Sequence, residues 1–213
     1  MKESLLRPLF KLDASLRQSL LAQIPGCRRL GRTCRKALFR VMSSDNSVLV
    51  DVAGQPLFIH AATAYVEQYV WNAYEPYTVE LFRNSITPGA VVLDIGACFG
   101  YFALLAGKRV GSDGMVYAFE PAPDNFALLA RNVHRFGTSN IIAVQKAVAE
   151  RRKTVSFRLA EYSYLHSCLQ HPQGPTKETI TVNCVAVDEF LEGRPVQVIK
   201  MDVEGYEEEV LRG

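Results

Sequence analysis

The sequence predicts an α/β fold in which a mostly parallel sheet carries helices on both of its faces. From residue 91 onward, short apolar runs typical of buried strands alternate with stretches of helical periodicity. The first run ends in Asp94 and is followed by Gly96, Gly100 and an apolar helical segment. This order of strand, glycine turn and helix is where an open α/β sheet binds a nucleotide-like ligand.

The composition is that of a folded domain. Of 213 residues, 48% are hydrophobic and 22% are charged, which excludes a largely disordered chain. No apolar run approaches the roughly 18–20 residues that a membrane helix needs, and the N-terminus lacks the apolar region of a secretory signal. The five cysteines form no Cys-x-x-Cys pair, and the histidines are scattered. We therefore expect reduced thiols, a cytoplasmic location and no metal site.

Residues 1–44 are expected to form a basic helical extension. They hold ten Lys or Arg against Glu3 and Asp13, a net charge of +8, which leaves −6 on the rest of a chain whose total is +2. Contact with an anionic lipid or nucleic-acid surface is one interpretation. A solvated helical extension packed on the body is favoured, because no aromatic residues interleave with the arginine cluster to stack on bases.

Residues 45–72 are predicted to form a hairpin and a covering segment, and residues 73–213 the main domain. Strands at 47–52 and 57–59 flank a turn that contains glycine and proline. Residues 61–72 are expected to continue as a helix or as a stretch that covers the hairpin.

The main domain is predicted to open with a helix at Pro76, since proline is tolerated in the first turn. Val79, Phe82 and Ile86 fall on one face of this helix at helical spacing. Residues 87–89, Thr-Pro-Gly, end the helix before the strand at 91–94 begins.

The remaining elements follow from the same signals of periodicity and turn chemistry. Strands are predicted at residues 115–119, 141–148, 154–159, 179–185 and 196–201. Short helices are predicted at residues 189–191, begun by Asp188, and at 207–212. A longer helix is capped by Asp124, turns Phe126, Leu129 and Val133 toward the core and closes at Gly137. A polar loop at 161–178 separates two of the strands.

Two interpretations compete for the ligand at the glycine turn. A dinucleotide fold has Gly-x-Gly-x-x-Gly after its first strand, whereas this chain has Asp-x-Gly-x-x-x-Gly, with the carboxylate ahead of the glycines. That order suits a ligand with a cationic amino-acid end. Asp94 can reach an ammonium group, and backbone N–H groups of the turn, which contains Gly96, Ala97 and Gly100, can take a carboxylate. S-adenosylmethionine has such an end.

A second acidic residue supports this ligand. Glu120 ends the second strand, 20 residues after Gly100, where an acidic side chain can accept hydrogen bonds from ribose hydroxyls. Adenine would then lie against Pro121 and Ala122 and against the turn at Ala147 and Val148.

Four motifs in order resemble FkbM-type S-adenosylmethionine-dependent methyltransferases, which are class I enzymes with a Rossmann-like fold. The motifs are Tyr-Glu-Pro at 74–76, Pro-Gly-Ala-Val-Val-Leu-Asp-Ile-Gly-Ala at 88–97, Phe-Glu-Pro-Ala-Pro-Asp-Asn at 119–125, and Ile-Lys-Met-Asp-Val-Glu-Gly at 199–205. The resemblance spans about residues 48–213. It implies methyl transfer to a hydroxyl oxygen, with Asp202 and Glu204 at the catalytic end of the site and Glu75 closing over the cofactor.

The chain departs from the family pattern at two places. Cys98 stands where the family usually has Asn, and we expect it to be a small buried thiol rather than a nucleophile. The chain ends at Gly213, one turn into the helix after the fourth strand. We therefore expect a Rossmann-like sheet that is incomplete at the C-terminus, in either a fragment of a longer protein or a truncated product. The exposed sheet edge would then invite self-association or a partner.

Three functions remain distinct at this point. The first is an O-methyltransferase for a hydroxyl of a small molecule or glycan. The second is a non-catalytic or fragmentary cofactor-binding module. The third is a nucleic-acid methyltransferase recruited by the basic extension, which is disfavoured because no Asn-Pro-Pro-Tyr-like base-methylating motif follows the fourth strand.

Overall fold

The computed structural model describes residues 47–52, 54–60, 63, 68–69, 73–160, 166–168 and 176–213. The chain divides into two compact units, Met1–Tyr74 and Glu75–Gly213. The predicted basic extension at 1–44 lies outside the described residues. None of the helices in the described part of the chain is long and apolar enough to cross a membrane.

The first unit contains the predicted hairpin. Strands β1 (Ser47–Val52) and β2 (Gln55–His60) pair antiparallel, with Val52 opposite Gln55. The second strand therefore begins two residues earlier than predicted. Gly54 adopts a left-handed conformation with φ of 80°, and its N–H donates to Asp51 Oδ1 at 3.0 Å, which explains so tight a turn. The predicted covering segment at 61–72 lies mostly outside the described residues.

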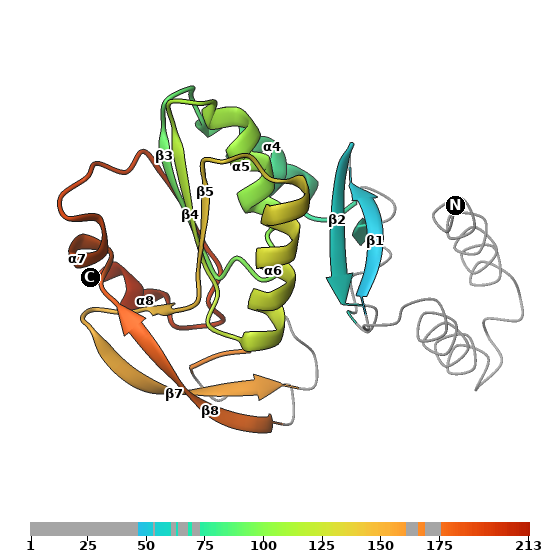
Figure 1. Ribbon diagram of the computed structural model, residues 1–213. Helices are drawn as coiled ribbons and strands as arrows, with labels where there is room; N and C mark the ends of the chain where they lie inside the picture. The colour runs from blue at the N-terminus through green and yellow to red at the C-terminus, as the bar shows by residue number, and fades with distance from the viewer. Residues whose placement is uncertain are drawn as a thin grey trace, which may run out of the picture. The chain divides into compact units, whose positions relative to one another are not determined.

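The second unit is built on a parallel four-stranded sheet with the order β5-β4-β3-β9 (Figure 1). The strands are β3 (Val91–Ile95), β4 (Met115–Phe119), β5 (Ile141–Val144) and β9 (Val198–Met201). The prediction of an α/β fold with a parallel sheet is confirmed. Because all four strands run the same way, the turns that follow β3, β4 and β9 meet at one edge of the sheet.

Helices lie on both faces of this sheet. On one face lie α5 (Tyr101–Val110), which follows β3, and α6 (Pro123–Phe136), which follows β4. Helix α4 (Pro76–Ser85) packs on α5 through an edge-on contact between Phe82 and Phe102, whose ring centroids are 5.2 Å apart. On the other face, Leu191 of α7 (Val187–Leu191) and Val210 of α8 (Glu207–Leu211) pack in one apolar cluster with Leu93 and Phe119. Figure 1 shows the sheet between these two layers.

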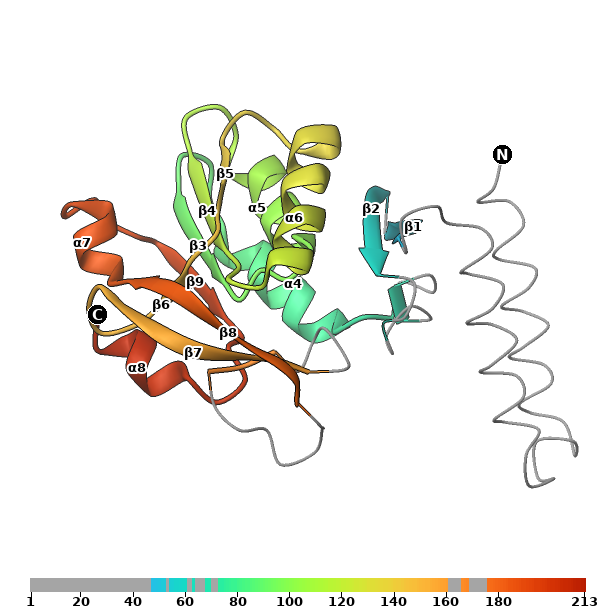
Figure 2. The ribbon, with the colours of Figure 1, turned by 60° about the horizontal axis from the view of Figure 1, so that its bottom comes forward.

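A second, three-stranded sheet was not anticipated. It has the order β6-β8-β7, with β6 (Ala147–Val148), β7 (Lys153–Ala160) and β8 (Thr176–Val185), and its β7–β8 pair is antiparallel (Figure 2). The predicted strand at 141–148 is therefore wrong as one element. After β5 the chain turns back, with the Lys146 N–H donating to Val144 O at 2.9 Å, and the last two residues pair with β8 instead.

The prediction for α6 is wrong in two details. Ala122 is the N-cap, Pro123 opens the helix, and Asp124 lies in its first turn, where its carboxylate accepts the Asn125 N–H at 3.1 Å. The buried face carries Asn125, Leu128, Leu129 and Asn132, whereas Phe126 and Val133 are only half-buried. Apolar periodicity misses this face because it ignores amides that are satisfied inside: Asn132 Nδ2 donates to Phe99 O at 2.7 Å.

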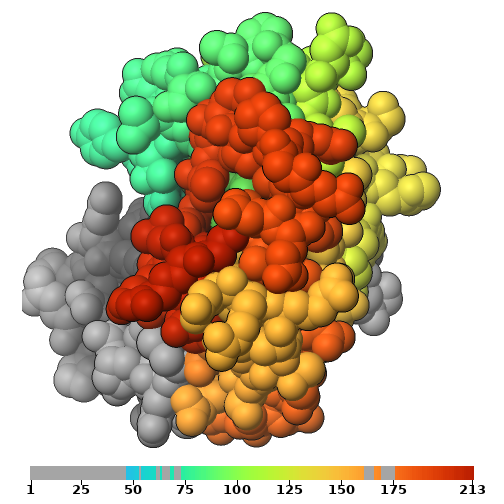
Figure 3. Space-filling model, turned by 90° about the vertical axis from the view of Figure 1, so that its left-hand side faces the viewer, coloured from blue at the N-terminus to red at the C-terminus, as the bar shows by residue number. Residues whose placement is uncertain are grey.

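The C-terminal segment closes the structure against the second sheet. Figure 3 shows the red residues of the C-terminus packed beside the gold residues that follow β6. Lys153 Nζ of β7 meets Glu209 Oε2 of α8 at 2.8 Å. The loop between β9 and α8 is therefore held on both sides, by β9 and by the contact of α8 with β7.

Candidate functional site

Three turns at the carboxyl ends of β3, β4 and β9 form the candidate site. Asp94 is the fourth residue of β3, Glu120 directly follows β4, and Asp202 directly follows β9. Asp94 and Glu120 are buried, whereas the Asp202 side chain is 50% exposed. The sequence predicted all three, and the structure brings their turns to the same edge of one sheet.

The glycine turn after β3 fits tightly against its neighbours. Gly96 has a φ of 78°, and a Cβ added there would lie 2.0 Å from the backbone oxygen of Asp202, so only glycine lets the end of β9 approach. The N–H groups of Gly96 and Ala97 both donate to Phe119 O, at 3.0 and 2.9 Å. Those two donors hold the turn to β4, and binding of a ligand's carboxylate by this turn stays a prediction.

Gly100 begins α5. It is the N-cap of the helix, with a φ of 90°, and an added Cβ would lie 2.7 Å from Leu129 Cδ1 of α6. Its N–H donates to Ala97 O at 2.8 Å. Glycine at this position therefore shapes the turn and lets α5 and α6 pack closely.

Glu120 joins two of the turns. Its Oε2 accepts the Cys98 N–H at 2.9 Å, and its Oε1 accepts the Ala122 N–H at 2.8 Å. Burial raises the pKa of the Glu120 carboxyl to about 8, although hydrogen bonds from Ala122 and Cys98 favour the charged form. This pKa makes Glu120 a group that changes charge near neutral pH.

Cys98 supplies a backbone donor in a strained conformation. Its φ of 51° is unusual for a residue other than glycine. Burial and the neighbouring Glu120 raise the pKa of its thiol well above the ordinary value, so the thiolate is disfavoured. Cys98 is half-buried rather than buried as expected, and the raised pKa agrees with the expectation that its thiol is not a nucleophile.

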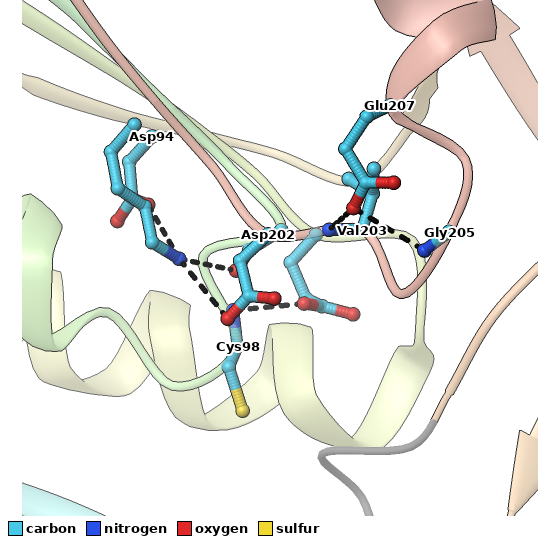
Figure 4. Close-up of polar contacts among 9 residues, drawn as sticks. Asp94, Cys98, Asp202, Val203, Gly205 and Glu207 are labelled. Atoms are coloured by element: carbon cyan, nitrogen blue, oxygen red, sulfur yellow. Dashed lines mark hydrogen bonds and ion pairs between the residues drawn. The ribbon is translucent and has the colours of Figure 1, made fainter.

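Asp94 and Asp202 flank the ammonium group of Lys200. Lys200 Nζ lies 3.7 Å from Asp94 Oδ1 and 3.8 Å from Asp202 Oδ2 (Figure 4). Burial raises the pKa of the Asp94 carboxyl, and the charge of Lys200 opposes that rise. No function was assigned to Lys200 from the sequence. The sequence feature that could have pointed to Lys200 is the presence of a lysine in a predicted apolar strand, two residues before Asp202.

The loop after β9 is held by Glu207 rather than by Glu204. Glu207 Oε1 accepts the N–H groups of Val203 and Gly205 at 3.4 and 3.3 Å (Figure 4). Glu204 has a left-handed backbone, with a φ of 54°, and its backbone oxygen accepts Ser167 Oγ at 2.9 Å. Its carboxylate is half-buried, and its role toward an acceptor stays a prediction.

Residues 166–168 connect β7 to two of the turns. The Ala160 N–H donates to His166 Nδ1 at 3.0 Å, and His166 Nε2 lies 3.8 Å from Asp124 Oδ1 at the start of α6. Ser167, which is 1% exposed, exchanges backbone hydrogen bonds with Arg158 and donates its hydroxyl to Glu204 O. This short segment thus reaches both the turn after β4 and the loop after β9.

The other predicted cofactor residues are placed as follows. Pro121 is half-buried between Glu120 and the N-cap Ala122, and Ala122 shares an apolar cluster with Ala147. Ala147 and Val148 are buried in β6 rather than in a turn, so their contact with adenine stays a prediction. Glu75 is exposed at the N-cap of α4, with a φ of 41°, and its closing over a cofactor also stays a prediction.

Within the described ranges, no cluster of three or more His, Cys, Asp or Glu has the arrangement of a metal site. The donor set is instead carboxylates and a lysine, which suits an organic ligand that carries hydroxyl and ammonium donors.

The fold and this site together define a Rossmann-like α/β domain that binds its ligand at the carboxyl ends of parallel strands. Residues 94–213 match the model of the methyltransferase FkbM domain. The chain therefore belongs to the FkbM methyltransferase family, whose cofactor is S-adenosyl-L-methionine. The predicted family is confirmed, and the matched residues contain the motifs at 119–125 and 199–205.

Individual relatives agree with this family. The hexuronic acid methyltransferase AglP of Haloferax volcanii is 31% identical over 142 residues, which are 65% of this chain and 56% of that protein. A protein-L-isoaspartate O-methyltransferase of Methanococcoides burtonii is 32% identical over 89 residues, which are 41% of this chain and 44% of that protein. The chain thus spans about half the length of the curated relatives it matches.

Among solved structures, the methyltransferase FkbM of Methylobacillus flagellatus KT is similar, with a TM-score of 0.42 and 16% identity, over 68% of this chain and 37% of that one. The similarity is too distant to transfer the role of any residue.

Proposed function

We propose that the chain provides the cofactor-binding part of an O-methyltransferase that uses S-adenosylmethionine to methylate a hydroxyl of a small molecule or glycan. The observation that carries the proposal is the linked set of Asp94, Glu120 and Asp202 at one sheet edge, joined through Lys200 and the Cys98 N–H. The similarity to a hexuronic acid methyltransferase supports a sugar acceptor, in particular a glycan that contains hexuronic acid.

The buried carboxylates fit the cofactor. The buried oxygens of Asp94 have only long contacts in the part of the chain that is described: Lys200 Nζ lies 3.7 Å away, and the Ala103 backbone and Lys200 favour the charged form without a hydrogen bond of regular geometry. Burying such a group costs free energy unless a donor reaches it, and the ammonium group of a bound amino-acid end would be that donor. Glu120 accepts the N–H groups of Cys98 and Ala122 and a hydrogen bond from the Asn125 side chain. A carboxylate offers roughly four acceptor positions, so a ribose hydroxyl can still bind there.

When bound, S-adenosylmethionine supplies an electrophilic methyl group on a sulfonium sulfur. In the proposal, Asp202 orients the acceptor hydroxyl and takes up its proton, because its half-exposed carboxylate lies at the end of β9 while Lys200 fixes it from within. Glu204 would bind the acceptor beside it. Alignment of the reacting atoms supplies most of the rate, since methyl transfer needs no covalent intermediate with the protein.

Calorimetry with S-adenosylmethionine and with its demethylated product tests the cofactor part of the proposal. We expect saturable binding of one molecule by the full chain, and a loss of affinity of more than about tenfold in Asp94→Asn, because a charged hydrogen bond is lost. Asp113→Asn is the matched control, since Asp113 is exposed in the turn before β4. Absence of binding by the unaltered chain would refute the proposal.

Transfer of a labelled methyl group to hexuronic acid glycosides tests the acceptor. Asp202→Asn is expected to lower turnover strongly while it leaves the affinity for the demethylated cofactor within about twofold, because Asp202 is assigned to the acceptor. An equal loss of cofactor affinity and turnover would contradict the assignment.

We also propose that the open edge of β9 meets a partner or a second copy of the chain. Among the strands that the structure describes, β9 pairs only with β3, and Ile199 in β9 is 48% exposed. Sedimentation over a range of concentrations tests this, and a monomer at all concentrations would exclude the second copy. The basic extension, on which the nucleic-acid hypothesis rested, lies outside the described residues, so that hypothesis gains no support.

A further inference from the structure

The proposed chemistry uses Lys200 to fix Asp202, whereas the contact of Lys200 with Asp94 has no role in it. It lies in β9 directly opposite Asp94 of β3 in the parallel register, so both side chains point to the same face of the sheet. The Lys200 side chain is only 13% exposed. A lysine buried to this extent is rare unless carboxylates or carbonyl oxygens compensate its charge.

Three acceptors surround the Lys200 ammonium group, and each comes from a different part of the site. Nζ lies 3.7 Å from Asp94 in β3, donates to the backbone oxygen of Gly96 in the glycine turn at 3.4 Å, and lies 3.8 Å from Asp202 after β9. The same ammonium group is 5.1 Å from the ring centroid of Phe102 in α5, within the range of a cation–π contact. One side chain therefore links the cofactor turn to the loop that carries Asp202.

The charges around Asp94 determine what this link does. Burial disfavours the charged carboxylate, Lys200 favours it, and Asp202 disfavours it. The remaining titratable groups of these turns are Glu120 after β4 and the Cys98 thiol between them. Loss of the positive charge of Lys200 would raise the pKa of Asp94 further, and only the backbone hydrogen bond from Ala103 would still favour its charged form. A carboxyl that holds a proton no longer accepts a hydrogen bond from an ammonium group at both oxygens.

We infer that Lys200 is a positioning residue: it keeps Asp94 charged and aligned with Asp202, so that the amino-acid end of the cofactor meets a carboxylate already in place. The inference rests on the proposed cofactor site. It assigns Lys200 to an effect on Asp94 rather than to direct contact with the ligand. The charge of Lys200, and not only its hydrogen bond to Gly96, is therefore the property that matters.

The variant Lys200→Gln separates the two properties, because glutamine is neutral but can still donate to the Gly96 oxygen. We measure the dissociation constant of S-adenosylhomocysteine by calorimetry at pH 6, 7 and 8 in the full chain. The ratio of the variant's constant to that of the unaltered chain is expected to rise from pH 8 to pH 6, by at most about tenfold per pH unit, since binding must then remove a proton from Asp94. Taking the ratio cancels the titration of Glu120, which is common to both proteins.

Three further variants sharpen the test. Lys200→Arg keeps the charge and is expected to retain the pH profile of the unaltered chain. In the double variant Asp94→Asn/Lys200→Gln the ratio to the unaltered chain is expected to lose the rise toward low pH seen for Lys200→Gln, because position 94 no longer titrates. Lys108→Met, at an exposed lysine near the end of α5, is the control for loss of a positive charge elsewhere and should leave the affinity unchanged.

Several results would overturn the inference. A loss of affinity that is the same at every pH would show direct contact or a purely structural role, and an unchanged affinity would show no role. If Lys200→Gln does not fold, the double variant is expected to fold, because it no longer buries the carboxylate of Asp94 without Lys200 beside it. Failure of the double variant to fold would also count against the inference. If the unaltered chain binds no ligand, both the proposed function and this inference fail. If it binds the ligand but the ratio of the two dissociation constants does not change with pH, only the inference fails.

Discussion

The replacement Glu120→Gln tests whether the buried carboxyl of Glu120, in the turn after β4, keeps its proton in the folded protein. The pKa of about 8 means that the folded protein keeps the Glu120 proton between pH 4.5 and 8, while the unfolded chain has already lost it. The folded state thus binds more protons in this window, and the free energy of unfolding contributed by Glu120 falls as the pH rises. The slope is about 1.4 kcal/mol per pH unit, and roughly 5 kcal/mol over the whole window.

Glutamine removes this slope because it does not titrate. It also meets the N–H groups of Cys98 and Ala122, each of which needs an acceptor, with only one amide oxygen. The variant is therefore expected to be less stable at pH 5 by about 1–3 kcal/mol, the cost of an unsatisfied buried donor. As the pH rises toward 8 this deficit should shrink and then reverse, since only the unaltered protein loses stability through this group.

Urea unfolding at half-unit steps from pH 5 to pH 8.5 measures the difference in stability between the two proteins. Asp113→Asn, at an exposed carboxylate, is the control whose difference should stay constant with pH. Parallel stability curves for Glu120→Gln and the unaltered protein would refute the reasoning. They would show that the two backbone donors compensate burial fully and keep Glu120 charged at all these values of pH.

Two further predictions concern the packing of the turns. Gly96→Ala combines a φ of 78° with a Cβ placed 2.0 Å from Asp202 O, so it should cost roughly 3–5 kcal/mol and abolish cofactor binding. Gly89→Ala, with a φ of 82° but no atom within 4 Å of the added Cβ, should cost only about 1–2 kcal/mol; equal losses in urea unfolding would contradict the packing argument. Ser167→Ala removes the hydroxyl that donates to Glu204 O and should speed amide hydrogen exchange in the loop after β9, with Ser167→Thr as the control that keeps a donor. Unchanged exchange would show that the loop is held by Glu207 alone.

The order of strands and helices in the second unit could be predicted because each element there carries its own local signal. The strand at 115–119 is a continuous apolar run, the strand at 91–95 is apolar except for Asp94, and glycine or proline marks the turns beside them. The run at 141–148 gave no such mark, so its division between two sheets was missed. Only the pairing of Ala147 with Cys184 shows that β6 belongs to a different sheet from β5.

The carboxylates at the strand ends of the candidate site could be predicted from the sequence. The side chains that hold the surrounding loops in place could not. Asp94, Glu120 and Asp202 follow directly from position, because the carboxyl ends of parallel strands converge. Glu207 holds the loop after β9, because its carboxylate accepts the N–H groups of Val203 and Gly205. Glu204 lies between those two residues with a left-handed backbone, a conformation that the sequence does not reveal. A spacing in the sequence does not report such a choice of conformation.

The sequence by itself determined the class of fold, the family and the glycine turn, because these depend on residue types at fixed local spacings. The tertiary structure decided the charge balance of the site. Lys200 and Asp94 are 106 residues apart in the chain, yet the register of β9 on β3 sets them opposite each other. Desolvation and Coulomb interactions depend on distance in space and on burial rather than on sequence position, so only the folded arrangement shows which carboxylates are paired, which carry protons and which can receive a ligand.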